Sequence, residues 1–226
     1  MTRVLGEGSV LALGTPVLRA EAHWPARGGG AAQARPRLSV LLLGPAGRVR
    51  GPEDFVAGPR TQHPSGQVRR LPPPAGGPPL DAVQLALAGL APDVQRLVLA
   101  VDAGGALLAS AGPLRLLLRD AAGGEVGELP LAVVSPRDTA LVCGEVSRGG
   151  AGWMFRATRR GFPGGAAELA AAFGAVPGGG TPPGGAPARG GHPPPAPRDT
   201  TPVPQPDPAF TLPPQGPQFR PGHAGP

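Results

Sequence analysis

The sequence has no lysine, asparagine, isoleucine or tyrosine, it has one cysteine, and only 4% of its residues are aromatic. A lone cysteine excludes both an internal disulfide and a cluster of thiolates around a structural metal. Without lysine there is no P-loop, and the chain also lacks the G-x-S-x-G sequence of a nucleophile elbow. Because these signatures of phosphate and acyl chemistry are missing, we predict that the protein is not an enzyme.

Long apolar segments are also missing. No apolar run approaches the roughly 18 residues that a membrane-spanning helix needs. Near the start of the chain, Glu7, Gly14 and Pro16 interrupt any apolar segment of the kind found in a secretory signal. We therefore expect no membrane span, and we predict a cytoplasmic location.

The charge of the chain is basic but dispersed. Its 21 basic residues are all arginines, and 15 acidic residues bring the formal net charge to +6. The excess is spread along the sequence, so it would favour anionic partners only weakly. Proteins that bind single-stranded nucleic acids usually add aromatic side chains for stacking, and these are scarce here. The composition therefore does not favour nucleic acid as a partner.

The end of the sequence differs from the rest. From Pro177 onward, 50 residues contain 17 prolines and 10 glycines, which leaves too few apolar side chains to offset the entropy lost on folding. We predict a domain of residues 1–176 and a disordered tail of residues 177–226. Alternating prolines from Pro202 to Pro208 suit a polyproline II segment, so the tail is either a spacer or a docking segment for an unidentified protein partner.

Short apolar stretches recur about every ten residues before the tail, separated by turns rich in glycine and proline. In one of them Leu114, Leu116 and Leu118 alternate with arginines, which is typical of a half-buried strand. A similar alternation predicts that Leu18, Ala20, Ala22 and Trp24 face in, whereas Arg19, Glu21 and His23 face out. The predicted strands cover residues 9–13, 17–24, 37–43, 54–56, 67–71, 80–87, 95–101, 113–119 and 125–134. This spacing predicts a mainly β fold, an antiparallel β-sandwich with one or two short helices.

Two further strands are predicted within residues 139–162. In the first, the period of two predicts that Ala140, Val142 and Val146 share one face. In the second, Trp153 and Phe155 share one face. The glycine-rich turn between these strands predicts a hairpin.

A short helix is predicted after the hairpin. Leu169 and Phe173 are four residues apart, so they would share one helix face, and Gly174 is a typical C-terminal stop. A helix this short is marginal in water by itself. We therefore predict that Leu169 and Phe173 pack onto the hairpin.

The hairpin and helix together resemble the C-terminal signature of TerD-type tellurium-resistance and stress proteins. The matching positions include Gly144, Glu145, Arg148, Trp153, Phe155, Arg156, Gly161, Phe162, Leu169, Phe173 and Gly174. Weaker similarity upstream extends the resemblance to residues 3–176. The resemblance implies a β-sandwich and a non-catalytic binding or scaffolding role in tellurite resistance or a general stress response.

The resemblance also implies calcium, since the family is associated with calcium binding through loops rich in carboxylates and amides. Arg35 and Arg37 stand where the family has alternating acids, Arg60 stands where it has an amide, and only Asp81 remains from an acidic segment. Calcium takes six to eight oxygen ligands, which one carboxylate beside arginines does not supply. We predict a degenerate calcium site with no metal and no other cofactor. Alternatively, Arg35, Arg37 and Arg60 form a site for phosphate, nucleic acid or an acidic protein.

Other reactive side chains have simpler interpretations. Cys143 lies within a strand pattern and has no base nearby in sequence, so we interpret it as a buried structural residue rather than a nucleophile. The four histidines show no metal-binding spacing. The arginines of the signature could form an anion-binding patch, but we interpret them as outward strand positions, some of them paired with acids. They are Arg148, Arg156, Arg159 and Arg160.

Overall fold

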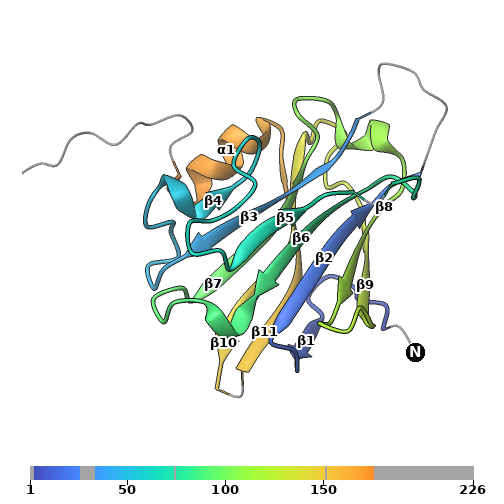
Figure 1. Cartoon of the computed structure of the whole chain (residues 1–226). Helices are drawn as coiled ribbons and strands as arrows, with labels where there is room; N and C mark the ends of the chain where they lie inside the picture. The colour runs from blue at the N-terminus through green and yellow to red at the C-terminus, as the bar shows by residue number, and fades with distance from the viewer. Residues whose placement is uncertain (1–2, 26–33, 74, 151, 176–226) are drawn as a thin grey trace, which may run out of the picture. The chain divides into compact units, whose positions relative to one another are not determined.

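This computed structural model describes residues 3–25, 34–73, 75–150 and 152–175, and these residues form eleven β-strands joined by loops and short helical segments. The strands form two antiparallel sheets, one of six strands and one of five, stacked face to face (Figure 1). The mainly β, antiparallel sandwich predicted from the sequence is confirmed. The tail that was predicted to be disordered, residues 177–226, lies outside the described residues.

The six-stranded sheet is called sheet 1 below, and the five-stranded sheet is called sheet 2. Sheet 1 has the order β1 (Val10–Leu13), β11 (Gly152–Phe162), β10 (Ala140–Gly149), β7 (Arg96–Asp102), β3 (Arg37–Leu43) and β4 (Phe55–Val56). Sheet 2 has the order β5 (Val68–Leu71), β6 (Leu80–Ala86), β2 (Val17–His23), β8 (Leu114–Arg119) and β9 (Glu125–Leu131). The helical segments are η1 (Pro52–Asp54), η2 (Leu87–Gly89), η3 (Leu108–Ala111) and α1 (Gly165–Ala172).

Aliphatic side chains fill the space between the sheets. Leu18 and Ala20 of β2 and Leu116 and Leu118 of β8 point into this core and are fully buried. Phe155 of β11, among the largest fully buried side chains, reaches the core from sheet 1. Successive residues of a strand point to opposite faces, so the alternation read from the sequence places these leucines correctly.

The hairpin of β10 and β11 contains a bulge, which corrects one prediction. Ala140 and Val142 lie on the outer face of sheet 1, as the alternation requires. The strand register then shifts between Val142 and Gly144, so Val146 lies on the opposite face, in the core between the sheets. A bulge inserts an extra residue and reverses the alternation beyond it. The prediction that Val146 shares a face with Ala140 was therefore wrong.

Helix α1 covers part of the outer face of sheet 1 (Figure 1). Leu169 is fully buried there beside Phe162 of β11, and Phe173 packs against the same cluster. The predicted packing of Leu169 and Phe173 on the hairpin is confirmed. The cluster is wider than the hairpin, because β3 and β7 also contribute to it. Its other buried members are Leu41, Leu43, Val98, Ala100, Ala140 and Val142.

The end of α1 is fixed by Gly174. This residue has φ +79°, a left-handed conformation that other residues rarely adopt. The amide of Ala175 then donates to the Ala170 carbonyl at 2.8 Å, which closes the last turn of the helix. The carbonyl of Phe173 accepts from the amide of Val49 at 3.0 Å, so the helix end is also tied to the loop after β3.

The outer face of sheet 2 carries Glu21 and His23, which point away from the core as the alternation predicts. They are nevertheless only 4% and 9% exposed. Arg19 and Arg119 contact Glu21 with their Nε atoms at 2.7 and 3.2 Å. Long arginine side chains lie along a sheet and cover shorter neighbours. The predicted direction of these two side chains is therefore confirmed, and their burial is a feature that the alternation does not reveal.

The central position of Phe155 leads to a stability prediction. Phe155→Ala should lower the free energy of unfolding by about 3–5 kcal/mol, because it leaves a cavity where β11 enters the core. The neighbouring Met154 is 39% exposed, so Met154→Ala should stay within about 0.5 kcal/mol of the unchanged protein. Urea unfolding followed by circular dichroism measures both variants. Equal losses for the two would contradict the central place of Phe155.

Candidate functional site

Asp81, the one residue predicted to remain from an acidic segment of the family, lies at one corner of the sandwich. This corner, called the Asp81 corner below, is made of Leu38, Gly58, Arg70 and Asp81. Asp81 is near the start of β6 and is 9% exposed. Its Oδ2 accepts the amide hydrogen of Leu38 at 2.6 Å, and its Oδ1 accepts from Arg70 Nη2 at 2.7 Å. Arg70 also donates to the carbonyl of Gly58 at 3.4 Å. Both carboxylate oxygens are thus engaged, and Asp81 links sheet 2 to β3 of sheet 1.

The three candidate anion-binding arginines lie toward the same end of β3 as the Asp81 corner. Arg37 is the first residue of β3 and Arg35 lies two residues before it, and both are exposed. Strand β4 runs antiparallel to β3, so the chain after β4 returns toward that start and carries the exposed Arg60 with it. Within the described residues, no carboxylate forms an ion pair with any of the three arginines.

The charge balance at this corner is positive. Asp81 is paired with Arg70, and Asp102 of β7 lies opposite Arg37 in the strand register, so two carboxylates stand against four arginines. Like charges raise the cost of placing a cation nearby and lower the cost of an anion. No group of three or more histidine, cysteine, aspartate or glutamate side chains is arranged to hold a metal within the part of the chain that the structure describes.

A buried acid that the sequence reading missed lies in the loop after β3. Asp54 is 1% exposed and receives Arg50 Nε at 2.8 Å, Arg50 Nη2 at 2.6 Å and His63 Nε2 at 3.2 Å. Burial raises the pKa of the Asp54 carboxyl, but the hydrogen bonds from Arg50 and His63 outweigh it and leave the pKa below its ordinary value. Because its oxygens are occupied, Asp54 acts as a crosslink between loops.

Arg148 of the signature also serves the structure. Its Nε donates to the Val94 carbonyl at 2.9 Å and its Nη2 to the Leu90 carbonyl at 2.8 Å. Its guanidinium also lies 4.5 Å from the centroid of the Trp153 ring. We interpreted the signature arginines as outward positions, some of them paired with acids, but the partners of Arg148 are backbone carbonyls and an indole. It fixes the loop that precedes β7.

The remaining arginines of the signature do not gather into one patch. Arg159 pairs with Glu7, and the Arg160 guanidinium lies 4.9 Å from the Phe162 ring. Arg156 is exposed, opposite Glu145 on β10, and Glu145 itself pairs with Arg96 of β7 at 3.2 Å. Each guanidinium therefore has its own surroundings, which gives little support to a shared anion site.

Two glycines of the signature are required by close packing. A Cβ atom on Gly144 would stand 2.5 Å from the Phe155 ring, and one on Gly161 would overlap the carboxylate of Asp138. Asp138 is 1% exposed, and its Oδ2 accepts the amide hydrogen of Ser135 at 2.7 Å. These two positions thus support the hairpin rather than a ligand.

Cys143 is fully buried in the core between the sheets. Burial raises the pKa of the Cys143 thiol to about 12, since a thiolate would lose its hydration there. The thiol contacts the Leu141 carbonyl at 3.6 Å. A thiol in this state is not a nucleophile at neutral pH.

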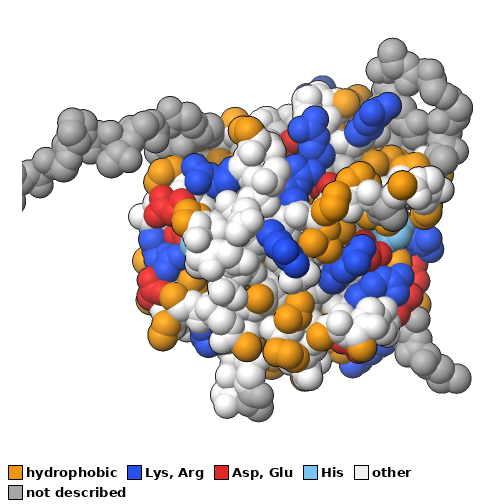
Figure 2. Space-filling model, viewed as in Figure 1, with side chains coloured by type: hydrophobic (Ala, Val, Ile, Leu, Met, Phe, Trp, Pro, Cys, Tyr) orange, Lys and Arg blue, Asp and Glu red, His pale blue; other side chains and the backbone are white. Residues whose placement is uncertain are grey.

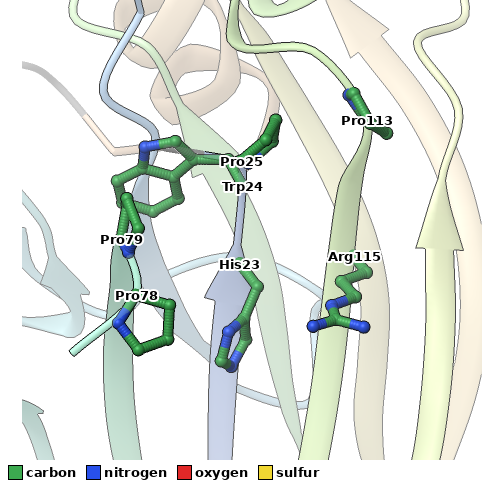
Figure 3. Close-up of a pocket in the computed structure, with 7 residues that line it drawn as sticks. All are labelled: His23, Trp24, Pro25, Pro78, Pro79, Pro113 and Arg115. Carbon is green, nitrogen blue, oxygen red and sulfur yellow. The ribbon is translucent and has the colours of Figure 1, made fainter. Parts of the chain in front are cut away.

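A pocket of about 430 Å³ opens on sheet 2, at the end where β2 finishes (Figure 3). His23 and Arg115 lie on adjacent strands, and the Trp24 ring stands beside prolines of the loop that leads into β6. The sequence reading missed this pocket, because its walls come from three separate segments. They are His23, Trp24 and Pro25, then Pro78 and Pro79, then Pro113 and Arg115.

The fold and these sites define a two-sheet antiparallel sandwich with one helix packed outside. The TerD domain profile matches residues 11–173, so the chain belongs to the TerD domain family. No curated protein matches the chain. Within the described residues, no helix is long and apolar enough to cross a bilayer.

Two solved structures resemble this one in fold. The crystal structure of a protein of unknown function, SAV2460, is 17% identical, has a TM-score of 0.54, and covers 67% of this chain and 92% of its own. A homologue of telluride resistance protein (TerD), SCO6318 from Streptomyces coelicolor A3(2), is 15% identical with a TM-score of 0.49, and covers 66% of this chain and 91% of its own. At such identities the likeness concerns the fold alone.

The contacts of Arg148 predict that lysine is a poor replacement. Arg148→Lys should lower the free energy of unfolding by about 1–3 kcal/mol, because one ammonium group cannot reach the same carbonyls and also stack on Trp153. Arg156→Lys is the matched control on the exposed face of β11, and it should change stability by less than about 0.5 kcal/mol. Urea unfolding of both variants is the measurement. An unchanged Arg148→Lys protein would contradict this role.

Proposed function

We propose that this TerD-family protein is a non-catalytic binding or scaffolding module of tellurite resistance or a general stress response, with a degenerate calcium site. The family assignment supports the biological setting. The buried Cys143, whose thiol stays protonated at neutral pH, supports the absence of catalysis. A cytoplasmic location and an unidentified protein partner, reached through the proline-rich tail, belong to the same proposal.

The observation that carries the calcium part of the proposal is the engagement of Asp81. A calcium ligand must turn a free oxygen toward the ion. Asp81 instead gives one oxygen to Arg70 and the other to the Leu38 amide. A bound cation would have to break both contacts and tolerate the arginines nearby, with no second carboxylate in the Asp81 corner to compensate.

A second candidate function uses the same corner for an anion. Arg35, Arg37 and Arg60 are exposed, and within the described residues none of them is paired with a carboxylate. Unpaired guanidinium groups bind phosphate and carboxylate well, because their donors match two oxygens at once. The partner would be a phosphate-bearing molecule or an acidic protein.

The calcium part of the proposal is tested by titrating calcium into the chelator-treated full chain in a calorimeter. We expect no binding in the micromolar range, because the corner offers far fewer than six oxygen ligands. Arg70→Ala frees Asp81 and should still give no binding, since one carboxylate is not enough. A micromolar site that disappears in Asp81→Asn would overturn the proposal.

The anion candidate is tested with fluorescently labelled polyphosphate and the full chain. If it is correct, anisotropy will report binding that weakens as salt rises. The combined change of Arg35, Arg37 and Arg60 to Ala should then remove it. The matched control changes Arg69, Arg137 and Arg156 to Ala, three exposed arginines elsewhere. Equal effects of the two triple variants would leave net charge as the cause and exclude a specific anion site.

A further inference from the structure

The pocket beside Trp24 is separate from the Asp81 corner. Along β2, Ala22 points into the core and His23 points to the outer face of sheet 2. Asp81 is the strand partner of Ala22 and reaches across toward sheet 1. His23 and Arg115, the polar residues of the pocket, therefore lie on the opposite face of sheet 2 from Asp81, and an inference about the pocket does not rest on the function proposed above.

One wall of the pocket is apolar and stiff. It consists of the Trp24 indole and the rings of Pro25, Pro78 and Pro79, with Pro113 across the opening (Figure 3). The amide of Trp24 is aligned with the carbonyl of Pro79 at 3.4 Å, so the loop before β6 is held against the end of β2. Proline rings and an indole lose little freedom when a flat molecule lies against them. Figure 2 shows hydrophobic side chains, basic side chains and a histidine close together on this face of the molecule.

The other side of the pocket is polar. His23 and Arg115 are strand partners, so their side chains stand next to each other on β2 and β8. The Arg115 side chain is 55% exposed, and its one ion pair among the described residues is a long contact of 3.7 Å with Glu128. The guanidinium can therefore turn toward a ligand at little cost.

The hydrogen bonding of His23 is set by Glu21, two residues earlier on β2. Burial raises the pKa of Glu21, but hydrogen bonds from His23 and Arg119 outweigh it and leave the pKa below its ordinary value. Glu21 is thus an anion that only accepts hydrogen bonds, so His23 Nε2 must donate to it across the 2.9 Å between them. The other ring nitrogen, Nδ1, has no hydrogen-bond partner among the described residues.

We propose that this pocket binds a small aromatic anion, a flat ring that carries a carboxylate or a phosphate. The ring lies against Trp24 and the prolines, and the anionic group contacts Arg115 and Nδ1 of His23. A volume of about 430 Å³ is within the usual range for small-molecule sites, which combine apolar walls with a few convergent polar groups. A neutral apolar ligand would cover Arg115 and His23 without pairing them, which is unfavourable.

Binding of the anion is coupled to a proton. Nδ1 of a neutral His23 has a lone pair that would repel an anionic oxygen, whereas the imidazolium donates from both nitrogens. The charged groups around the imidazole are Glu21 on its own strand and Arg115 and Arg119 on β8, while β6 places Leu80 opposite it. An anionic oxygen at Nδ1 needs a donor there, so the ligand should bind together with a proton at Nδ1.

Calorimetry on the full chain tests the site with four probes. Phenyl phosphate and benzoate have both a ring and a charge, benzyl alcohol has the ring alone, and inorganic phosphate has the charge alone. We expect binding of one or both aromatic anions, and affinity at least about tenfold weaker for benzyl alcohol and inorganic phosphate. Equal affinity for inorganic phosphate would overturn the role of the apolar wall, and no binding of either aromatic anion would overturn the site.

Variants separate this site from general attraction to a basic protein. Arg115→Gln should weaken binding of the aromatic anion roughly tenfold to a hundredfold, whereas Arg137→Gln, at an exposed arginine elsewhere, should leave it unchanged.

Titration in two buffers of different ionisation enthalpy should reveal proton uptake that His23→Gln removes. Equal affinities for the two arginine variants would overturn the proposal, and the absence of proton uptake would overturn the part assigned to His23. Calcium and polyphosphate titrations do not involve this pocket, so their outcome is independent.

Discussion

The pairing of β10 with β11 is the interaction on which both hydrophobic clusters depend. On its inner face the hairpin sends Val146 and Phe155 into the core between the sheets. On its outer face it presents Val142 and Phe162 to Leu169 of helix α1. The bulge after Val142 makes this division possible, because it reverses the face to which the following side chains point. The same two strands therefore supply apolar side chains to one face before the bulge and to the opposite face after it. Loss of the hairpin would therefore open both clusters.

Arginines hold three of the four buried acids among the described residues. Glu21, Asp54 and Asp81 are all nearly buried, and each contacts at least one guanidinium. The fourth, Asp138, accepts the amide hydrogen of Ser135 instead. A buried carboxylate is costly unless its oxygens are paired, and the planar donors of arginine satisfy two oxygens better than a single ammonium group does. The three acids that contact arginines therefore stabilise the sandwich.

The alternation of apolar residues was enough to predict the strands, the sandwich and the packing of Leu169 on the hairpin. It failed at Val146, where a bulge changed the phase. A bulge depends on the neighbouring strand, so the residues around Val146 do not reveal it by themselves. The resemblance to the TerD family singled out Asp81, but its contacts with Arg70 and Leu38 appear only in three dimensions.

By itself the sequence determined the class of fold, because the class of fold follows from residue type and local spacing. Only the tertiary structure determined which groups Asp81 contacts, which loop Arg148 holds, and that Trp24, Arg115 and the prolines line one pocket. Each of these arrangements joins residues from separate segments, and the distances between them are set by how the two sheets pair and stack. That stacking is a cooperative result of the whole core, so no single stretch of sequence contains it.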